Sequence, residues 1–197
     1  MHEFQSIVEL LAALIIDPRT GVLFLLLVLA AIYDIRTYKI PNWLVASGIA
    51  FALVYTAVVP IPYQGGVLWA LGGLGLGFLL MLPIYAIRAM GAGDVKLMAM
   101  IGGFVGLADI FYVVLATFIV GGVAALGFAA VNGVMKRMLG NIKAAVQGVM
   151  FSVLGGAGGA THISVANSAG RIPYGVSISI ATTGYVVAKQ LGFWSVF

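Results

Sequence analysis

The sequence contains no cysteine, and this absence removes several classes of protein at once. Disulfide bonds, thiolate nucleophiles and cysteine-ligated metals are excluded within these 197 residues. Histidine is nearly absent too: His2 and His162 lie far apart and no HExxH pattern is present, so a zinc peptidase is not indicated. No GxSG pattern of a serine-type membrane peptidase occurs either. We therefore expect neither a metal nor another cofactor.

Charge is scarce as well. Charged residues make up 8% of the chain and hydrophobic types 62%, whereas a soluble domain carries about a quarter charged residues. Such a chain cannot cover a surface that faces water, and a membrane environment explains the composition. The net charge of +4 comes from ten basic residues scattered among apolar runs, which favours a role in membrane topology over nucleic-acid binding. We expect one all-α, polytopic membrane domain over residues 1–197.

Apolar runs predict about six transmembrane helices, at about 20 residues per span. Prolines mark the second span, since Pro41 opens it and Pro60 and Pro62 close it. The predicted spans are Gly21–Tyr33, Trp43–Val59, Gly66–Ile87, Val95–Leu107, Ile110–Val131 and Tyr174–Val187. We expect the first span to extend upstream into Ile7–Ile16, with a break or kink at Asp17-Pro18 between the two apolar runs. Within the long connection Asn132–Pro173 we expect an amphipathic helix on the membrane surface at Asn141–Val153, followed by a glycine-rich hinge; disorder is the alternative for the glycine stretch.

Basic residues occur in alternate loops between these spans, and their distribution predicts the orientation. The loops after spans one, three and five contain lysine or arginine, and the loops after spans two and four contain none. Because basic residues concentrate on the cytoplasmic side, the first, third and fifth loops are expected in the cytoplasm and both termini outside. Arg19 and Lys189 are single exceptions near the termini.

Two of the six acidic residues, Asp34 and Asp94, lie at the predicted cytoplasmic ends of spans. A charged side chain costs about 2.5 kcal/mol or more at the centre of a membrane helix and less near the interface. Two close carboxylates cannot both ionise easily, so they share a proton. The ionised carboxylate can then take a proton from water, while the protonated one hydrogen-bonds to a scissile carbonyl. This arrangement hydrolyses peptides without a metal.

Structural interpretations of the same aspartates are equally open on pattern alone. Asp94 follows Gly91 and Gly93 and could cap the amino end of a helix. Asp34 could be an interfacial acid paired with Arg36 or Lys39. A transporter in which both aspartates form an ion or proton path is a further alternative, as is a non-catalytic assembly protein of a secretion apparatus.

Three sequence elements resemble those of the type IV prepilin peptidases. The stretch DIRTYKIPNWL resembles the first aspartate motif of that family, GAGDVK resembles the second or GxGD motif, and IPYG resembles the Pro-aromatic-Gly element before the last span. Their order and membrane context agree over nearly the whole chain. The matching positions are Asp34, Arg36, Pro41 and Asn42 in the first element, Gly91, Gly93, Asp94 and Lys96 in the second, and Pro173 and Gly175 in the third.

This resemblance implies that Asp34 and Asp94 are the catalytic pair of an aspartyl endopeptidase in the inner (cytoplasmic) membrane. The enzyme would remove leader peptides from prepilins or pseudopilins at the cytoplasmic face, so its partners would be a prepilin helix and membrane lipid. The longer, bifunctional family members carry an N-terminal cytoplasmic domain, often with paired CxxC motifs, and also N-methylate their product. The cysteine-free chain is similar to the compact Flp/Tad peptidases, although archaeal preflagellin peptidases are compact too, and we expect cleavage without methyl transfer. Lys96 is expected mainly to contact lipid phosphates.

Overall fold

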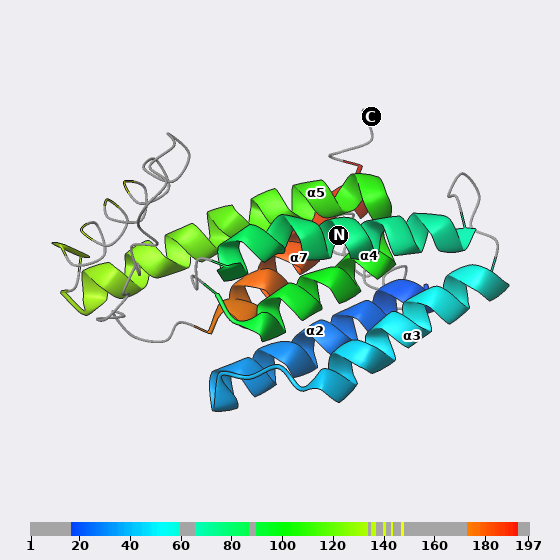
Figure 1. Cartoon of the computed structure of the whole chain (residues 1–197), viewed down its shortest axis with the longest axis horizontal. Coiled ribbons are helices and arrows are strands. Elements are labelled where there is room, and N and C mark those ends of the chain that lie inside the picture. Colours follow the sequence, from blue (N-terminus) through cyan, green and yellow to red (C-terminus); the bar gives the residue numbers. More distant parts are fainter. Residues whose placement is uncertain are drawn as a thin grey trace, which may run out of the picture. The chain divides into compact units, whose positions relative to one another are not determined.

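The computed structural model describes residues 17–59, 66–86, 90–133 and 173–192, with a few separate positions between 135 and 147. Within these ranges every regular element is a helix, which confirms the all-α prediction for this part of the chain (Figure 1). The predicted surface helix at Asn141–Val153 and the glycine-rich stretch after it lie outside the continuously described ranges. The helices are α2 (Pro18–Thr37), α3 (Asn42–Val58), α4 (Gly66–Ala86), α5 (Ala92–Val131) and α7 (Tyr174–Gln190).

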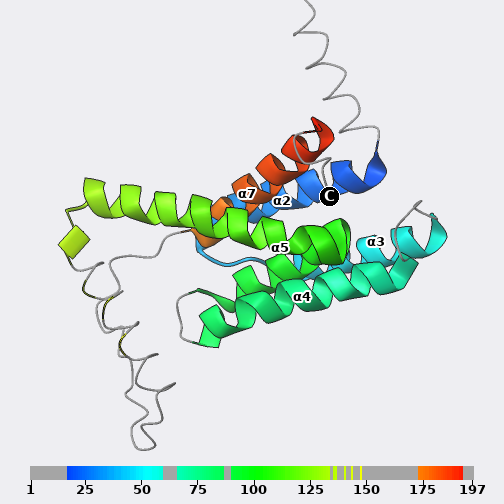
Figure 2. The same ribbon diagram turned by 90° about the horizontal axis from the view of Figure 1, so that it is seen from above.

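The chain forms two compact units, and the helices around the candidate site belong to the first. That unit comprises Met1–Gly121 and Pro173–Phe197, and the second comprises Gly122–Ile172. In the first unit α2 packs against both α3 and α7, and α3 packs against α4 (Figures 1 and 2). The last helix therefore returns to the first one, although more than 130 residues separate them along the chain.

Local sequence signals set both ends of α2. The carboxylate of Asp17 accepts hydrogen bonds from the main-chain N–H of Arg19 at 3.2 Å and from the Thr20 hydroxyl at 2.7 Å, and Pro18 occupies the first helical turn. An aspartate cap followed by proline is a strong helix start, so α2 begins at Pro18, where the sequence predicts a break. It ends at Tyr38, whose N–H still donates to the carbonyl of Asp34 at 2.8 Å and whose left-handed backbone (φ 52°) turns the chain out of the helix.

Helix α5 folds back on itself at Gly106. There the backbone leaves the helical region (φ 84°, ψ −177°). A Cβ atom placed on Gly77 of α4 would lie 2.7 Å from the carbonyl oxygen of Met98 and 3.1 Å from Cγ1 of Ile110. In a straight helix these two residues would be about 18 Å apart, so the two arms of α5 run in opposite directions. The turn falls between the predicted fourth and fifth spans.

The count of six membrane spans is not confirmed. Among the described residues, three helices are long and apolar enough to cross a membrane: α2, α4 and α5. Helix α3 is apolar but shorter, and α7 has only 17 residues. The molecule is a helical membrane protein, and its described residues contain fewer candidate spanning helices than the sequence predicts.

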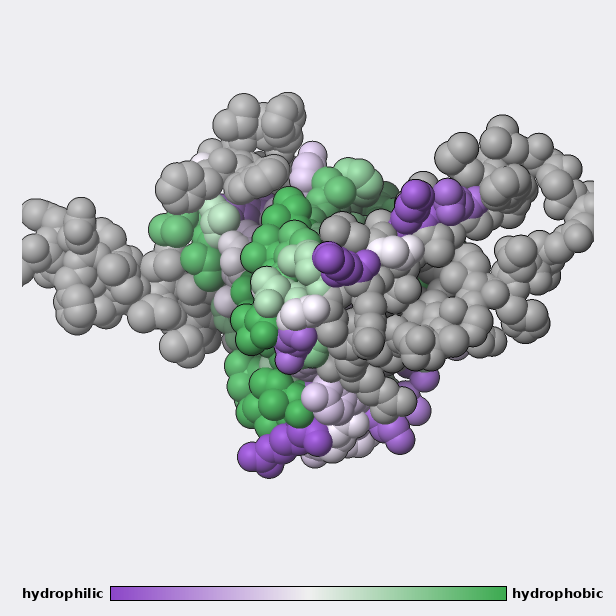
Figure 3. Space-filling model, turned by 90° about the vertical axis from the view of Figure 1, so that its left-hand side faces the viewer, coloured by the Kyte–Doolittle hydropathy of each residue, from purple (hydrophilic) through white to green (hydrophobic). Residues whose placement is uncertain are grey.

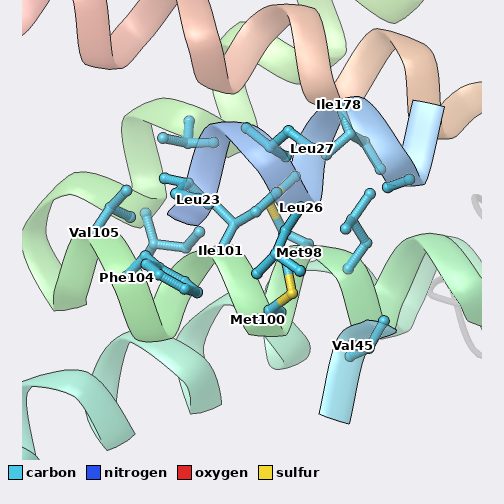
Figure 4. Packing of buried hydrophobic residues seen from close by; sticks show 14 of the residues in the cluster. Leu23, Leu26, Leu27, Val45, Met98, Met100, Ile101, Phe104, Val105 and Ile178 are labelled. Atoms are coloured by element: carbon cyan, nitrogen blue, oxygen red, sulfur yellow. The ribbon is translucent and has the colours of Figure 1, made fainter. Parts of the chain in front are cut away.

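The core is built from α2 and the first arm of α5, and α3 and α7 add to it. Leu27, Met98, Ile101 and Ile178 are almost fully buried and point toward one another (Figure 4). Large apolar side chains also cover the outside, and Figure 3 shows hydrophobic residues in a contiguous area beside separate hydrophilic patches. An apolar exterior around an apolar core is expected of a chain whose solvent is lipid.

Gly73 and Gly77, and likewise Gly102 and Gly106, have the four-residue spacing that predicts close helix packing in a membrane, and they bring α4 and α5 close together. A Cβ atom on Gly73 would collide with the backbone of Gly102 and Gly106, and one on Gly77 would lie against Met98. Small residues let membrane helices approach until their backbones are in contact. The close-packing prediction is confirmed at these positions.

Candidate active site

Asp34 lies in the last turn of α2 and is 5% exposed. Its Oδ2 accepts a hydrogen bond of 2.7 Å from the main-chain N–H of Gly175, and the N–H of Val176 also hydrogen-bonds to the carboxylate. Both donors belong to the first turn of α7. The carboxylate therefore faces the amino end of another helix. Arg36 and Lys39, the alternative partners that the sequence offers, have exposed side chains.

Gly175 leaves room for this contact. A Cβ atom at this position would lie 2.9 Å from Oδ2 of Asp34 and 3.1 Å from its Cγ. Any side chain would therefore push the carboxylate away from the N–H group that binds it. The sequence resemblance singled out Gly175, but a main-chain donor 141 positions from its acceptor leaves no pattern by which its role could be predicted.

Asp94 lies in the first turn of α5 and is 8% exposed. Its Oδ2 accepts a hydrogen bond of 3.0 Å from the N–H of Gly91, and its own N–H donates to the carbonyl of Gly91 at 3.1 Å. This reciprocal pair closes the GxGD turn in the manner of a capping box. The acid is inside the first turn instead of at the cap itself, and the positive end of the helix dipole favours its charge.

The two aspartates come together at one end of the bundle. Their carboxylates lie within electrostatic range of each other, and the Tyr174 side chain lies within electrostatic range of Asp94. A Cβ atom on Gly93 would lie 3.3 Å from Cβ of Ile40, so the GxGD turn packs directly on the loop that follows Asp34. All three elements of the sequence resemblance therefore meet at one site.

Lys96 and Asn42 connect the two aspartate segments. The Lys96 Nζ donates a hydrogen bond of 3.0 Å to the side-chain oxygen of Asn42, at an exposed position. This bond links the start of α5 to the start of α3, a contact that the lipid-phosphate expectation for Lys96 did not include. Pro41 and Pro173 occupy the residue before α3 and before α7, where fixed backbone angles help to start a helix.

A second polar cluster lies at the opposite end of the same helices, and sequence reasoning missed it. Arg19 is 8% exposed, donates to the carbonyl of Gly103 at 3.2 Å and lies 4.5 Å above the Trp69 ring. Lys189 pairs with Asp109. These residues line a cavity of about 620 Å³. Fifteen helical residues separate Arg19 from Asp34, a distance of about 22 Å.

Arg19 and Lys189, the two exceptions to the alternation of basic loops, therefore both make contacts within the fold. Arg19 binds α5 and α4, and Lys189 binds the second arm of α5, where the Tyr185 hydroxyl also donates to Asp109 at 2.9 Å. The sequence signal for this cluster was the presence of the acids Asp17 and Asp109, which line the same cavity as the two cations.

Comparison with protein families gives one match. The model of the type IV leader peptidase family matches residues 21–126, just over half of the chain. The matched range contains Asp34, Asp94, Asn42 and Lys96, and it ends before α7. Comparison with curated proteins and with solved structures gave no match.

Proposed function

Because the chain belongs to the type IV leader peptidase family, we propose that it is an aspartyl endopeptidase that cleaves prepilin leaders with Asp34 and Asp94 as its catalytic pair. One observation supports this assignment above the others: two buried carboxylates from separate helices lie at the same end of the bundle, within electrostatic range. Burying two acids in an apolar membrane chain is costly, and acids so placed usually serve a function.

The proposed reaction is general acid-base hydrolysis. The ionised aspartate takes a proton from a water molecule, and the resulting hydroxide attacks the scissile carbonyl carbon. The protonated aspartate donates a hydrogen bond to the carbonyl oxygen, and the resulting tetrahedral intermediate collapses as the leaving amine receives a proton. The C–N bond breaks, one water is consumed, and the pair returns to its shared-proton state. Gly91 and Gly175 hold the two carboxylates through their main-chain N–H groups.

The substrate we propose is a Flp-like prepilin or pseudopilin with a basic leader before an apolar helix. Cleavage takes place at the cytoplasmic face of the inner membrane and is not followed by N-methylation. The charge distribution supports this orientation. The absence of cysteine from these 197 residues supports cleavage alone, because the methylating relatives that the sequence resembles carry CxxC motifs.

An ion or proton path through the two aspartates has less support. Such a path needs polar groups that continue across the bundle. The buried hydroxyls of Thr56, Thr117 and Thr182 each donate to the carbonyl four residues earlier in the same helix. These donor groups are therefore satisfied by their own helices, which favours hydrolysis as the use of the two acids.

The proposal is tested by expressing the protein together with tagged prepilins from the source genome and measuring the masses of the products by mass spectrometry. A processed product should have lost its leader and carry an unmethylated amino terminus. Processing should persist in the presence of a metal chelator, since neither carboxylate requires a metal in this mechanism. Loss of processing with the chelator would instead indicate a metallopeptidase.

A further inference from the structure

The amino end of α7 reaches both aspartates through two consecutive residues. Gly175 donates its N–H to Oδ2 of Asp34 at 2.7 Å, and the side chain of Tyr174 lies within electrostatic range of Asp94. The catalytic elements described above belong to α2 and α5, and the family match ends before α7 begins. A third helix therefore takes part in the geometry of the pair.

Asp34 has a physical need for this contact. It lies in the last turn of α2, where the helix dipole places partial negative charge and disfavours a carboxylate. The first turn of α7 presents unsatisfied N–H groups and partial positive charge. Hydrogen bonds from main-chain N–H groups to a carboxylate are short and strong. The amino end of α7 thus offsets the unfavourable position of Asp34 in its own helix.

The position of α7 along α2 is itself fixed. One turn after Gly175, the single proton of the Ser179 hydroxyl is shared between the carbonyl of Leu27 in α2 at 3.0 Å and the carbonyl of Gly175 at 2.8 Å. The Tyr174 ring rests against Gly121 of α5, where a Cβ atom would lie 2.7 Å from Cζ of the tyrosine. These contacts hold the first turn of α7 between α2 and α5.

We propose that the first turn of α7 is the positioning element of the peptidase site, with Gly175 as the residue that sets the orientation of Asp34 toward Asp94 and the attacking water. This inference rests on the proposed function. Gly175 is a positioning residue because it acts through Asp34. Its N–H group holds one carboxylate oxygen, and its missing side chain leaves the space that this oxygen occupies.

The test compares two glycine-to-alanine substitutions in α7. Gly175→Ala places a methyl group against the Asp34 carboxylate, whereas a Cβ atom on Gly184 meets nothing within 4 Å. The assay uses the purified enzyme in phospholipid vesicles, with a tagged prepilin that the unaltered enzyme processes. We expect Gly175→Ala to lower kcat about 100-fold, the effect of a catalytic group misplaced by about 1 Å, with KM changed by less than about twofold. Gly184→Ala should retain the original kcat and KM.

A second variant covers the case in which Gly175→Ala does not fold. Ser179→Ala removes the hydroxyl that fixes α7 on α2 without placing an atom near Asp34. It should lower kcat more than it raises KM, while the melting temperature of the vesicle-bound protein stays close to the original. A kcat within about threefold of the original for a folded Gly175→Ala variant would overturn the inference. So would a folded Ser179→Ala variant in which KM alone changes.

The outcome also separates this inference from the function on which it rests. If Asp34→Asn and Asp94→Asn abolish cleavage but Gly175→Ala cleaves normally, the role of α7 is wrong and the catalytic pair stands. If the two asparagine variants still cleave the prepilin, the proposed function fails first.

Discussion

At the scale of single residues, the sequence predicts which acids matter and the structure shows what holds them. The two aspartates stand out because acids are rare in the chain and these two are at span ends. Their partners could not be predicted, since Gly175 and Gly91 bind them through main-chain N–H groups that every residue except proline has. Arg36 and Lys39 looked like partners for Asp34 by proximity in sequence, yet both are exposed.

Lys96 provides a prediction at this scale. Its hydrogen bond to Asn42 is exposed to solvent, and such bonds contribute about 1 kcal/mol or less. We therefore expect Lys96→Met to cleave prepilin at a rate within about threefold of the original and to melt within a few degrees of it. A loss of activity comparable to that of Asp94→Asn, measured in the same vesicle assay, would mean that Lys96 acts on the aspartate pair directly.

At the scale of helices, the boundaries beside proline and the reversal between the fourth and fifth spans are predictable, but the packing around the reversal is not. Proline and the residues beside it place the starts of α3 and α7 within one residue of prediction. The turn inside α5 has no proline; it depends on Gly106 in a left-handed conformation with the Trp69 ring in the space where a side chain would be. The sequence therefore indicates a break near Gly106, but only the structure shows which atoms of α4 and α5 come into contact there.

The α4–α5 contact gives the second prediction, with a control two residues away. Gly73→Ala would drive a methyl group into the α5 backbone, whereas a Cβ atom on Gly75 meets nothing within 4 Å. Overpacking of this kind costs about 1–3 kcal/mol, so Gly73→Ala should melt at a lower temperature than the original. Gly75→Ala should be unchanged or slightly more stable, because alanine favours a helix by about 0.5–1 kcal/mol. Equal melting temperatures for both variants, measured in the same vesicles, would contradict the packing.

At the scale of the molecule, polar residues gather at two ends of an otherwise apolar bundle. One end carries the aspartate pair, and the other carries Arg19, Asp109 and Lys189. The alternation of charged loops predicts that the aspartate end faces one side of the membrane. It does not predict the second cluster, because Arg19 and Lys189 are exceptions to that alternation. The sequence could not predict that the cations at the second end are bound within the fold, because their partners come from different helices.

The lack of cysteine makes the orientation directly measurable. Single cysteines at Thr37 and Gln190 would lie at exposed positions at opposite ends of the described helices. With a maleimide that cannot cross membranes, we expect Gln190→Cys to be labelled in intact spheroplasts and Thr37→Cys only in inverted membrane vesicles. The reverse pattern would place the aspartates outside the cytoplasm and contradict the proposed site of cleavage.

The most direct measurement of the catalytic pair is prepilin processing by aspartate variants that still insert into the membrane. Asp34→Asn and Asp94→Asn should each abolish cleavage, because one carboxylate cannot both accept the proton of water and supply the proton to the substrate. Asp109→Asn is the matched control, because Asp109 also belongs to α5 but lies at the opposite end of the bundle from the aspartate pair, and this variant should still cleave. We predict full-length prepilin with Asp34→Asn and with Asp94→Asn, and leaderless prepilin with Asp109→Asn. Normal processing by either Asp34→Asn or Asp94→Asn would contradict the catalytic pair.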